Sequence, residues 1–346
     1  MAISDRYHRQ RLVDGVGDDG QLAISNATVA IVGIGALGCM SASMLARAGI
    51  GHLILIDRDI VETTNLQRQV LFTESDAHAQ QPKAVAAKEH LSEVNSEIKI
   101  TACVEDLNSK NILRLLDGVD VIVDGLDNFN DRYLLNDYAI QTETPFMFAG
   151  VVAGVGNVMT IIPNSTPCLR CLFHEPPEGG VQETCDTVGV LSPAIGIAAS
   201  CQCMDVLKFL TGNQDKISRT LLTFDLWNSQ SNRIDVGNPL DDCCCCQQFD
   251  FKFLQSSVVE PVALCGRLAV LLPSRGDFDL EIAQRKLREH GSFVKTETMV
   301  RGEFNEERAS DGSAIKMLCF HDGRSIIHGT DDILRAKAIF ERYIGN

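Results

Sequence analysis

Positive charge is scarce in this sequence. Its 346 residues include 31 Lys and Arg against 46 Asp and Glu, which gives a formal net charge of −15 at pH 7. Nucleic acids and anionic membrane surfaces bind proteins through clusters of basic side chains. We therefore expect neither nucleic acid nor a membrane as a partner, although a few cations can still form a local site for an anionic ligand.

Long hydrophobic runs are also missing. The most apolar stretch, around residues 188–200, is interrupted by Ser192, Pro193 and Gly196. It is too short to span a bilayer, which requires about 20 apolar residues. The first residues, Met1–Arg6, are partly charged and contain no apolar signal core. These features favour a cytoplasmic location.

Cysteine, in contrast, is abundant, with 13 residues in the chain. In a cytoplasmic protein this number favours metal binding or thiol chemistry over a disulfide framework. Two Cys-x-x-Cys pairs stand out, one at Cys168 and Cys171 and the other within Cys243–Cys246. Two such pairs supply the four thiolates of a tetrahedral Zn²⁺ site. They lie too far apart in sequence for a compact zinc finger, so buried thiols without a metal are the alternative.

Short aliphatic segments alternate with helical patterns in the first part of the chain. This alternation predicts a Rossmann-like, doubly wound α/β fold with a mostly parallel sheet and helices on both faces. The expected strands cover residues 28–33, 52–57, 98–104 and 119–123, and the expected helices cover 36–48, 84–94 and 131–142. Beyond Gly150 the sheet is expected to continue into an antiparallel part, with strands at 157–163, 221–225 and 233–236 and a long helix at 193–210.

The sequence predicts two domains. Residues 1–250 form the α/β domain, and residues 258–346 form a small α+β C-terminal domain. Within the latter we expect strands at 268–272, 315–321 and 325–328, helices at 279–290 and 332–343, and a polar loop at 302–312. The segment 173–189 is rich in Pro, Gly and polar residues and is expected to be a mobile loop.

A glycine-rich turn, Gly33–Gly38, follows the first strand and opens a helix. Glycines there allow the backbone to approach a phosphate, and the helix N-terminus attracts negative charge. Asp57 ends the next strand, where a carboxylate accepts hydrogen bonds from ribose hydroxyls. The pattern predicts a nucleotide site, with a glycine-rich packing turn as the alternative, but does not distinguish ATP from NAD or FAD.

Further charged residues narrow the choice of nucleotide. Arg68 and Lys83 follow the second strand and suit a triphosphate, while an Asp in the segment Asp124–Asn128 would offer oxygen ligands to Mg²⁺. Each residue alone is more often a solvated or helix-capping group. Together at one sheet edge they favour ATP. An NAD-dependent oxidoreductase would need a hydride-transfer acid or base in a substrate domain, and the sequence offers no evident candidate.

Six ordered blocks resemble the ThiF/MoeB/HesA family, whose members are adenylyltransferases related to ubiquitin-activating enzymes. The blocks are RYHRQ (Arg6–Gln10), GIGALG (Gly33–Gly38), DRD (Asp57–Asp59), NLQRQ (Asn65–Gln69), QPK (Gln81–Lys83) and GLDN (Gly125–Asn128). The resemblance covers about residues 5–250 and implies a ThiF/MoeB-type adenylation domain. Two further segments, 263–267 and 328–332, are similar to the tail of longer bacterial ThiF-like proteins.

The resemblance implies ATP-dependent adenylylation of a ubiquitin-like sulfur-carrier protein at its C-terminal Gly-Gly carboxylate, with release of pyrophosphate. A ThiS-like carrier of thiamin thiazole synthesis is favoured. The alternatives are a MoaD-like carrier of molybdopterin synthesis and a carrier-binding scaffold without catalysis. The resemblance also implies a homodimer in which Arg9 reaches the ATP phosphates of the neighbouring subunit, and a sulfurtransferase or cysteine desulfurase as sulfur donor.

The same resemblance implies roles for individual residues. The nucleotide-binding set is Gly33, Gly35, Gly38, Asp57, Asp59, Asn65, Arg68, Lys83 and Asp127, in which Asp57 would hold ribose and Asp127 would hold Mg²⁺. The catalytic set is Arg9, Arg68, Lys83, Asp127 and Cys185. The implied zinc ligands are Cys168, Cys171, Cys243 and Cys246, with a shift to Cys244 or Cys245 as the alternative. Cys185 is expected to take part in covalent thiol chemistry, or else to be a passive loop cysteine.

Overall fold

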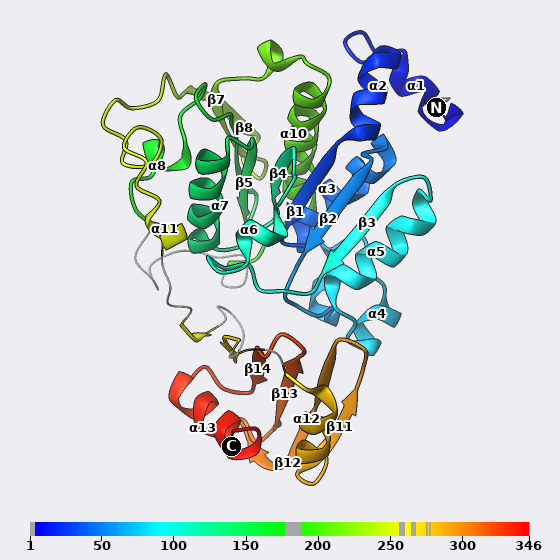
Figure 1. Ribbon diagram of the computed structural model, residues 1–346, viewed down its shortest axis with the longest axis vertical. Coiled ribbons are helices and arrows are strands. Elements are labelled where there is room, and N and C mark those ends of the chain that lie inside the picture. Colours follow the sequence, from blue (N-terminus) through cyan, green and yellow to red (C-terminus); the bar gives the residue numbers. More distant parts are fainter. Residues whose placement is uncertain are drawn as a thin grey trace. The chain divides into compact units, whose positions relative to one another are not determined.

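Hydrophobic strands organise the first of two compact units, Met1–Ser257, into an eight-stranded sheet (Figure 1). The computed structural model describes residues 4–176, 188–255, 260–263, 268–274, 276 and 278–345. The strand order is β3-β2-β1-β4-β5-β6-β7-β8. The strands are β1 (Thr28–Val32), β2 (His52–Ile56), β3 (Lys99–Cys103), β4 (Val121–Asp124), β5 (Phe146–Val152), β6 (Val155–Ile161), β7 (Thr220–Asp225) and β8 (Gln230–Asp235).

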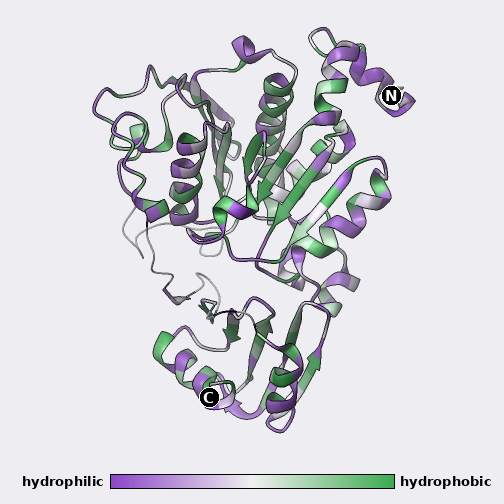
Figure 2. Cartoon of the chain, viewed as in Figure 1, coloured by the Kyte–Doolittle hydropathy of each residue, from purple (hydrophilic) through white to green (hydrophobic). Residues whose placement is uncertain are grey.

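The sheet has a parallel and an antiparallel half. Strands β3, β2, β1, β4 and β5 are parallel, and β5, β6, β7 and β8 pair antiparallel. Both faces of the parallel half are covered, so its strands are apolar at almost every position, as the colouring of Figure 2 shows. This architecture confirms the predicted Rossmann-like sheet with an antiparallel continuation.

Helices cover both faces of this sheet. On one face lie α3 (Ala36–Ala48), α5 (Lys83–Val94) and α10 (Ser192–Leu210), which share a hydrophobic core with Val29 and Ile31. On the other face lie α6 (Ile112–Leu115) and α7 (Phe129–Thr142), which pack with Ala30 and Val32. The other helices among the described residues of this unit are η1 (Asp5–Tyr7), α1 (His8–Arg11), α2 (Gly17–Asn26), η2 (Thr63–Asn65), α4 (Glu74–Ala79), α8 (Leu169–Leu172), η3 (Gln214–Lys216) and α11 (Lys252–Gln255).

Among the described residues, one helix is long and apolar enough to cross a membrane by these two criteria, namely α10. Its residues Ala198 and Val206 are fully buried, and the helix packs against α3, β5 and β6. Part of its apolar surface is therefore buried in the contact with the sheet and α3.

The second unit, Val258–Asn346, is built on a six-stranded antiparallel sheet with the order β11-β12-β13-β14-β10-β9. Its core contains Phe304 and Phe340. The elements are β9 (Val262–Ala263), β10 (Ala269–Leu272), α12 (Leu280–Leu287), β11 (Gly291–Lys295), β12 (Met299–Arg308), β13 (Ala314–Phe320), β14 (Ser325–His328) and α13 (Ile333–Tyr343).

Strand β12 corrects the prediction of a polar loop at 302–312. The strand extends to Arg308, and only Phe304 is buried in its second half. With polar residues at most other positions, this half lacks the alternation of apolar and polar side chains by which strands are recognised.

Candidate active site

Two turns at the carboxyl edge of the parallel strands pack backbone against backbone. Gly33 has a φ of +87°, and a Cβ atom there would lie 2.6 Å from the carbonyl oxygen of Gly125. A Cβ atom on Gly125 would lie 2.0 Å from the Gly33 oxygen, and one on Gly38 would lie 1.9 Å from the same oxygen. Side chains are therefore excluded at Gly33, Gly38 and Gly125. At Gly35 a Cβ atom would make only an ordinary contact of 3.8 Å, so packing does not require glycine there.

Asp57 connects the end of β2 to this glycine turn. Its carboxylate accepts hydrogen bonds from the backbone N–H groups of Ile34, at 2.6 Å, and Asp59, at 2.7 Å. Burial raises the pKa of the Asp57 carboxyl, although the charge of Lys83 acts in the opposite direction. Each carboxylate oxygen has a second lone pair, so Asp57 retains acceptor capacity for a ligand hydroxyl.

Lys83 lies beside the same strand end. Its Nζ atom is 3.0 Å from Oδ2 of Asp59, and its backbone N–H donates to the Asp59 carbonyl oxygen at 2.9 Å. Lys83 is only 3% exposed, so its ammonium group is held inside the protein next to two carboxylates.

The η2 segment supplies two more of the predicted residues. Asn65 is buried, and its side-chain oxygen accepts a hydrogen bond from the Glu62 N–H at 3.0 Å. Arg68 is partly exposed and donates to the carbonyl oxygen of Thr64 at 2.9 Å. The buried Asn65 thus fixes the segment that presents Arg68.

The turn between β4 and α7 presents Asp127, which is exposed. The next residue, Asn128, caps α7 by accepting a hydrogen bond from the Asp131 N–H at 2.9 Å. Burial raises the pKa of Asp131 to about 6, although the charge of Arg58 acts in the opposite direction. The Asp131 carboxyl thus lies in a group of charged side chains that includes Arg58 and Asp127.

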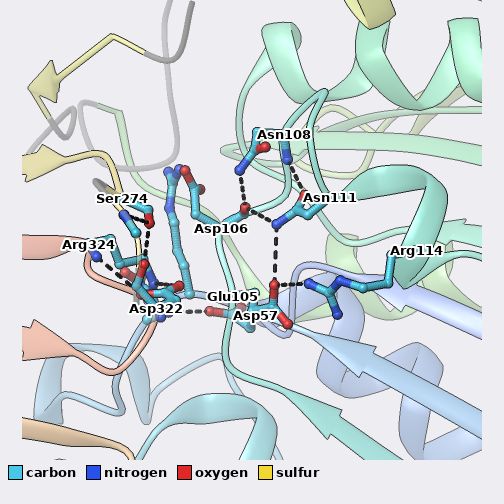
Figure 3. A network of polar contacts seen from close by, with 12 residues as sticks. Asp57, Glu105, Asp106, Asn108, Asn111, Arg114, Ser274, Asp322 and Arg324 are labelled. Atoms are coloured by element: carbon cyan, nitrogen blue, oxygen red, sulfur yellow. Dashed lines mark hydrogen bonds and ion pairs between the residues drawn. The ribbon is translucent and has the colours of Figure 1, made fainter. Parts of the chain in front are cut away.

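Side chains of the loop after β3 bond to one another and to the backbone of the loop. In Figure 3, Asn111 and Arg114 donate to Glu105, and Asn108 and Asn111 donate to the backbone carbonyl of Asp106. The carboxylate of Asp106 lies 2.7 Å from Nη1 of Arg58. This contact fixes a cation directly after Asp57 that the sequence analysis did not single out.

The sequence analysis also missed an ion pair below the Asp127 turn. Asp124, at the end of β4, is fully buried and pairs with Nε of Arg132 at 2.9 Å. Burial raises the pKa of Asp124, and the charge of Arg132 opposes this shift. One signal was available in the sequence: Arg132 lies in the first turns of α7, where the helix dipole disfavours a cation unless it has an anionic partner.

Arg9 lies away from these residues. In the segment around it, Tyr7 accepts a hydrogen bond from Asn95 at 2.9 Å, and Gln10 donates to the carbonyl oxygen of Ala48 at 2.9 Å. Ala48 is the last residue of α3, a helix of 13 residues that spans about 20 Å. The glycine turn lies at the other end of α3. The structure thus brings together the predicted residues around Asp57, Lys83 and Asp127, but not Arg9 of the same chain.

Four cysteine thiols converge on the α7 side of the sheet. The Sγ atoms of Cys168, Cys171, Cys243 and Cys246 all lie within 4.8 Å of one another. Sγ of Cys168 is 3.9 Å from that of Cys171 and 3.7 Å from that of Cys243, and the distance from Cys171 to Cys246 is 3.5 Å. A tetrahedral site with Zn–S bonds of 2.3 Å has S–S distances of about 3.8 Å. The four thiols therefore fit this geometry.

The two middle cysteines of the run are not among these four thiols, although the Cys245 thiol also lies next to that of Cys168. Sγ of Cys245 donates to Asp137 and accepts from Asn136, both at 3.3 Å. The thiol of Cys245 is thus already used in the core, and the outer pair of the run belongs to the cluster. Cys185, predicted to be catalytic, lies outside the described residues, as does most of the loop predicted around it.

Comparison with known proteins identifies the class to which this fold and site belong. The pattern of the ThiF family matches residues 7–245, and the chain belongs to this family. It is 40% identical to the sulfur carrier protein ThiS adenylyltransferase of Bacillus subtilis (strain 168), over 99% of this chain and 100% of the relative. It is 34% identical to the sulfur carrier protein adenylyltransferase of Thermus thermophilus, over 76% of this chain and 96% of the relative.

A solved structure agrees with this assignment. The crystal structure of E. coli MccB with ATP superimposes with a TM-score of 0.59 at 25% identity, covering 70% of this chain and 75% of MccB. The fold of about 70% of this chain is therefore shared with a protein whose structure contains ATP.

Proposed function

We propose that this protein is an adenylyltransferase that uses ATP to activate the C-terminal carboxylate of a ubiquitin-like sulfur-carrier protein, of the ThiS-like kind that serves thiamin thiazole synthesis. The observation that carries the proposal is the meeting of three structures at one sheet edge: the glycine turn after β1, the Asp57–Asp59–Lys83 group after β2, and the Asp127 turn after β4. The two relatives named as sulfur-carrier adenylyltransferases support the choice of substrate.

ATP would lie across this edge. Packing within the protein does not explain the glycine at position 35. Close approach of a phosphate to the backbone would explain it. Asp57 would accept a hydrogen bond from the ribose. Asn65, Arg68 and Lys83 would bind the phosphates, and the helix N-terminus at Ala36 adds positive potential.

The reaction needs little more than positioning and charge stabilisation. The carrier carboxylate attacks the α-phosphorus, a new bond forms between its oxygen and phosphorus, and the bond to the pyrophosphate oxygen breaks. The carboxylate is ionised at neutral pH, so no general base is required. Arg68 and Lys83 would stabilise the charge that develops on the departing pyrophosphate. Asp127 offers the carboxylate for Mg²⁺, which neutralises phosphate charge when bound.

A homodimer would complete the site. Because Arg9 lies at the far end of α3 from the glycine turn of its own chain, it would act on the phosphates bound by a second copy. We also propose Zn²⁺ as the metal of the four-cysteine cluster, with a structural role. Cys185 and an external sulfurtransferase or cysteine desulfurase would act after adenylylation, in the cytoplasm.

Carrier-dependent exchange of pyrophosphate into ATP tests the proposal directly. Purified protein is assayed with a ThiS-like carrier and, separately, with a MoaD-like carrier, each ending in Gly-Gly. We expect exchange with the ThiS-like carrier, and a loss of about 100-fold or more in Asp127→Ala, because the charge at the phosphates is no longer held in place. Cys185→Ser should retain exchange, because adenylylation does not use this thiol.

The other outcomes are equally informative. Exchange with the MoaD-like carrier alone would assign the protein to molybdopterin synthesis. Exchange with neither carrier, in protein that still binds ATP, would contradict the catalytic proposal and favour a carrier-binding scaffold.

A further inference from the structure

We propose that Arg132 is a positioning residue, which holds the turn that presents Asp127 in the geometry needed for Mg²⁺–ATP. The inference rests on the proposed function, since it concerns the same site. Arg132 itself is 6% exposed and lies beneath the turn, so it acts through the backbone of the turn and not through contact with the nucleotide.

The guanidinium of Arg132 joins three separate segments. Nε pairs with the Asp124 carboxylate at the end of β4, at 2.9 Å. Nη2 donates to the carbonyl oxygen of Leu126 in the turn, at 2.7 Å, and to that of Ala149 in β5, at 2.9 Å. A single side chain thereby ties the turn to the end of β4 and to the neighbouring strand β5.

The Asp124 carboxylate holds the turn from the other side. It accepts hydrogen bonds from the N–H of Leu126 at 2.8 Å and from the N–H of Ala149 at 3.4 Å. Both the N–H and the carbonyl of Leu126 are thus bound to the ion pair. Leu126 stands directly before Asp127, and Gly125 before it touches Gly33 of the nucleotide turn. Any displacement of Arg132 would therefore move both turns of the site.

Stability alone does not explain an ion pair at this position. Removing two charges from water costs about as much as their attraction returns, and well-packed apolar residues are often as stable. In addition, α7 places Arg132 near its own N-terminus, where the helix dipole disfavours a cation. What the pair provides is a fixed geometry, because a planar guanidinium can bond several acceptors in set directions, whereas an ammonium group is a point charge.

The chain contains a matched control in Arg170. It is 2% exposed, and its Nη1 atom lies 3.7 Å from the carboxylate of Asp137, which is also fully buried. It further donates to the carbonyl oxygen of Asp250 at 2.9 Å. Arg170 therefore has similar burial and a similar partner, but it lies beside the cysteine cluster and away from the Asp127 turn.

The test compares Arg132→Lys with Arg170→Lys in the full-length protein. ATP binding is measured by calorimetry at increasing Mg²⁺ concentration, together with the thermal midpoint, bound zinc and carrier-dependent exchange. We expect the half-saturating Mg²⁺ concentration to rise about 10-fold or more in Arg132→Lys, as is typical when an outer partner of a metal-binding group is removed. In the exchange assay of Arg132→Lys, kcat should fall by a larger factor than the KM for the carrier rises. Arg170→Lys should lower the thermal midpoint and leave the Mg²⁺ dependence unchanged.

Asp124→Asn provides a second variant, since it removes the charge and keeps the shape. It should also raise the Mg²⁺ requirement.

An unchanged Mg²⁺ dependence in a folded Arg132→Lys protein would overturn the inference, and so would equal shifts in Arg132→Lys and Arg170→Lys. If both Arg132→Lys and Asp124→Asn fail to fold while Arg170→Lys folds, the pair is a stability element and the inference is wrong. Because nucleotide binding is measured without a carrier, failure of the proposed reaction would be visible separately, as absent exchange in a wild-type protein that binds Mg²⁺–ATP.

Discussion

Lys83 places a positive charge inside the protein, next to the carboxylate of Asp59. Its ammonium group lies 3.0 Å from Oδ2 of Asp59. An ammonium group is a point charge that also binds phosphate oxygens. The side chain lies at the start of α5, so the helix dipole does not favour its charge there. Its position is better explained by a nearby anion than by the helix itself.

Lys83→Met should therefore reduce both nucleotide binding and stability. We expect carrier-dependent exchange to fall about 100-fold, because a charge that stabilises the phosphates is removed. We also expect the free energy of unfolding to fall by about 3 kcal/mol, because the carboxylates of Asp57 and Asp59 lose their common partner. Exchange assays and denaturant unfolding measure the two effects.

Lys88→Met is the matched control for this change. It removes the same group from an exposed position of the same helix. Exchange and stability should both stay close to those of the unaltered protein. Equal losses in the two variants would mean that the net charge of α5, and not the position of Lys83, is responsible.

The cysteine cluster joins two distant elements of the first unit. Cys168 immediately precedes α8, and Cys246 belongs to the segment before α11. A four-thiolate metal site between them would hold the antiparallel half of the sheet against α7. Structural zinc contributes roughly 10 kcal/mol or more to folding in small zinc-finger peptides, so its loss should be visible in stability.

Substitutions within the four-cysteine run test which thiols bind the metal. Cys246→Ser should lose bound zinc and lower the thermal midpoint, because a hydroxyl is a poor replacement for a thiolate ligand. Cys245→Ser should retain one zinc per chain, with a smaller loss of stability from its contact with Asp137. Elemental analysis of the purified variants measures the metal content. Zinc loss in Cys245→Ser with full retention in Cys246→Ser would reverse the ligand assignment.

Elements were predictable where their sequence pattern is periodic or strongly aliphatic. Strands β1, β2 and β4 lie in the buried centre of the sheet, and helices α3 and α10 follow the predicted bounds closely. Strand β5 was not predicted, because Phe146–Val152 is an apolar run without alternation, and such a run does not separate a strand from a buried helix. Its position became clear only from its pairing with β4 and β6.

The assembled site was less predictable than its parts. The glycine turn and Asp57 follow from local motifs, and both lie at the same sheet edge. The contact between Gly33 and Gly125 joins residues far apart in sequence, as does the Arg132 hydrogen bond to Ala149. Such contacts depend on strand order, which no single segment encodes.

The position of Arg9 has a consequence for the whole assembly. If each site takes Arg9 from one copy and Asp127 from another, a variant defective in one residue should complement a variant defective in the other. Arg9→Ala and Asp127→Ala should each be inactive alone. After the subunits of the two variants have been mixed and re-equilibrated, half of the dimers contain one chain of each variant. Each of these dimers has one intact site out of two, so about a quarter of the wild-type pyrophosphate-exchange activity should return. Activity that stays at background after confirmed subunit mixing would contradict a shared site.

The cysteine cluster also sets an order of events during synthesis of the chain. Cys168 and Cys243 are separated by 75 positions, as are Cys171 and Cys246. At 5–20 residues per second, the second pair leaves the ribosome about 4 to 15 seconds after the first. The intervening chain contains α10, β7 and β8, which must all be made before four thiols can meet. A bound metal would therefore mark a nascent chain whose nucleotide-binding sheet has been completed, and the early cysteines must remain reduced until then.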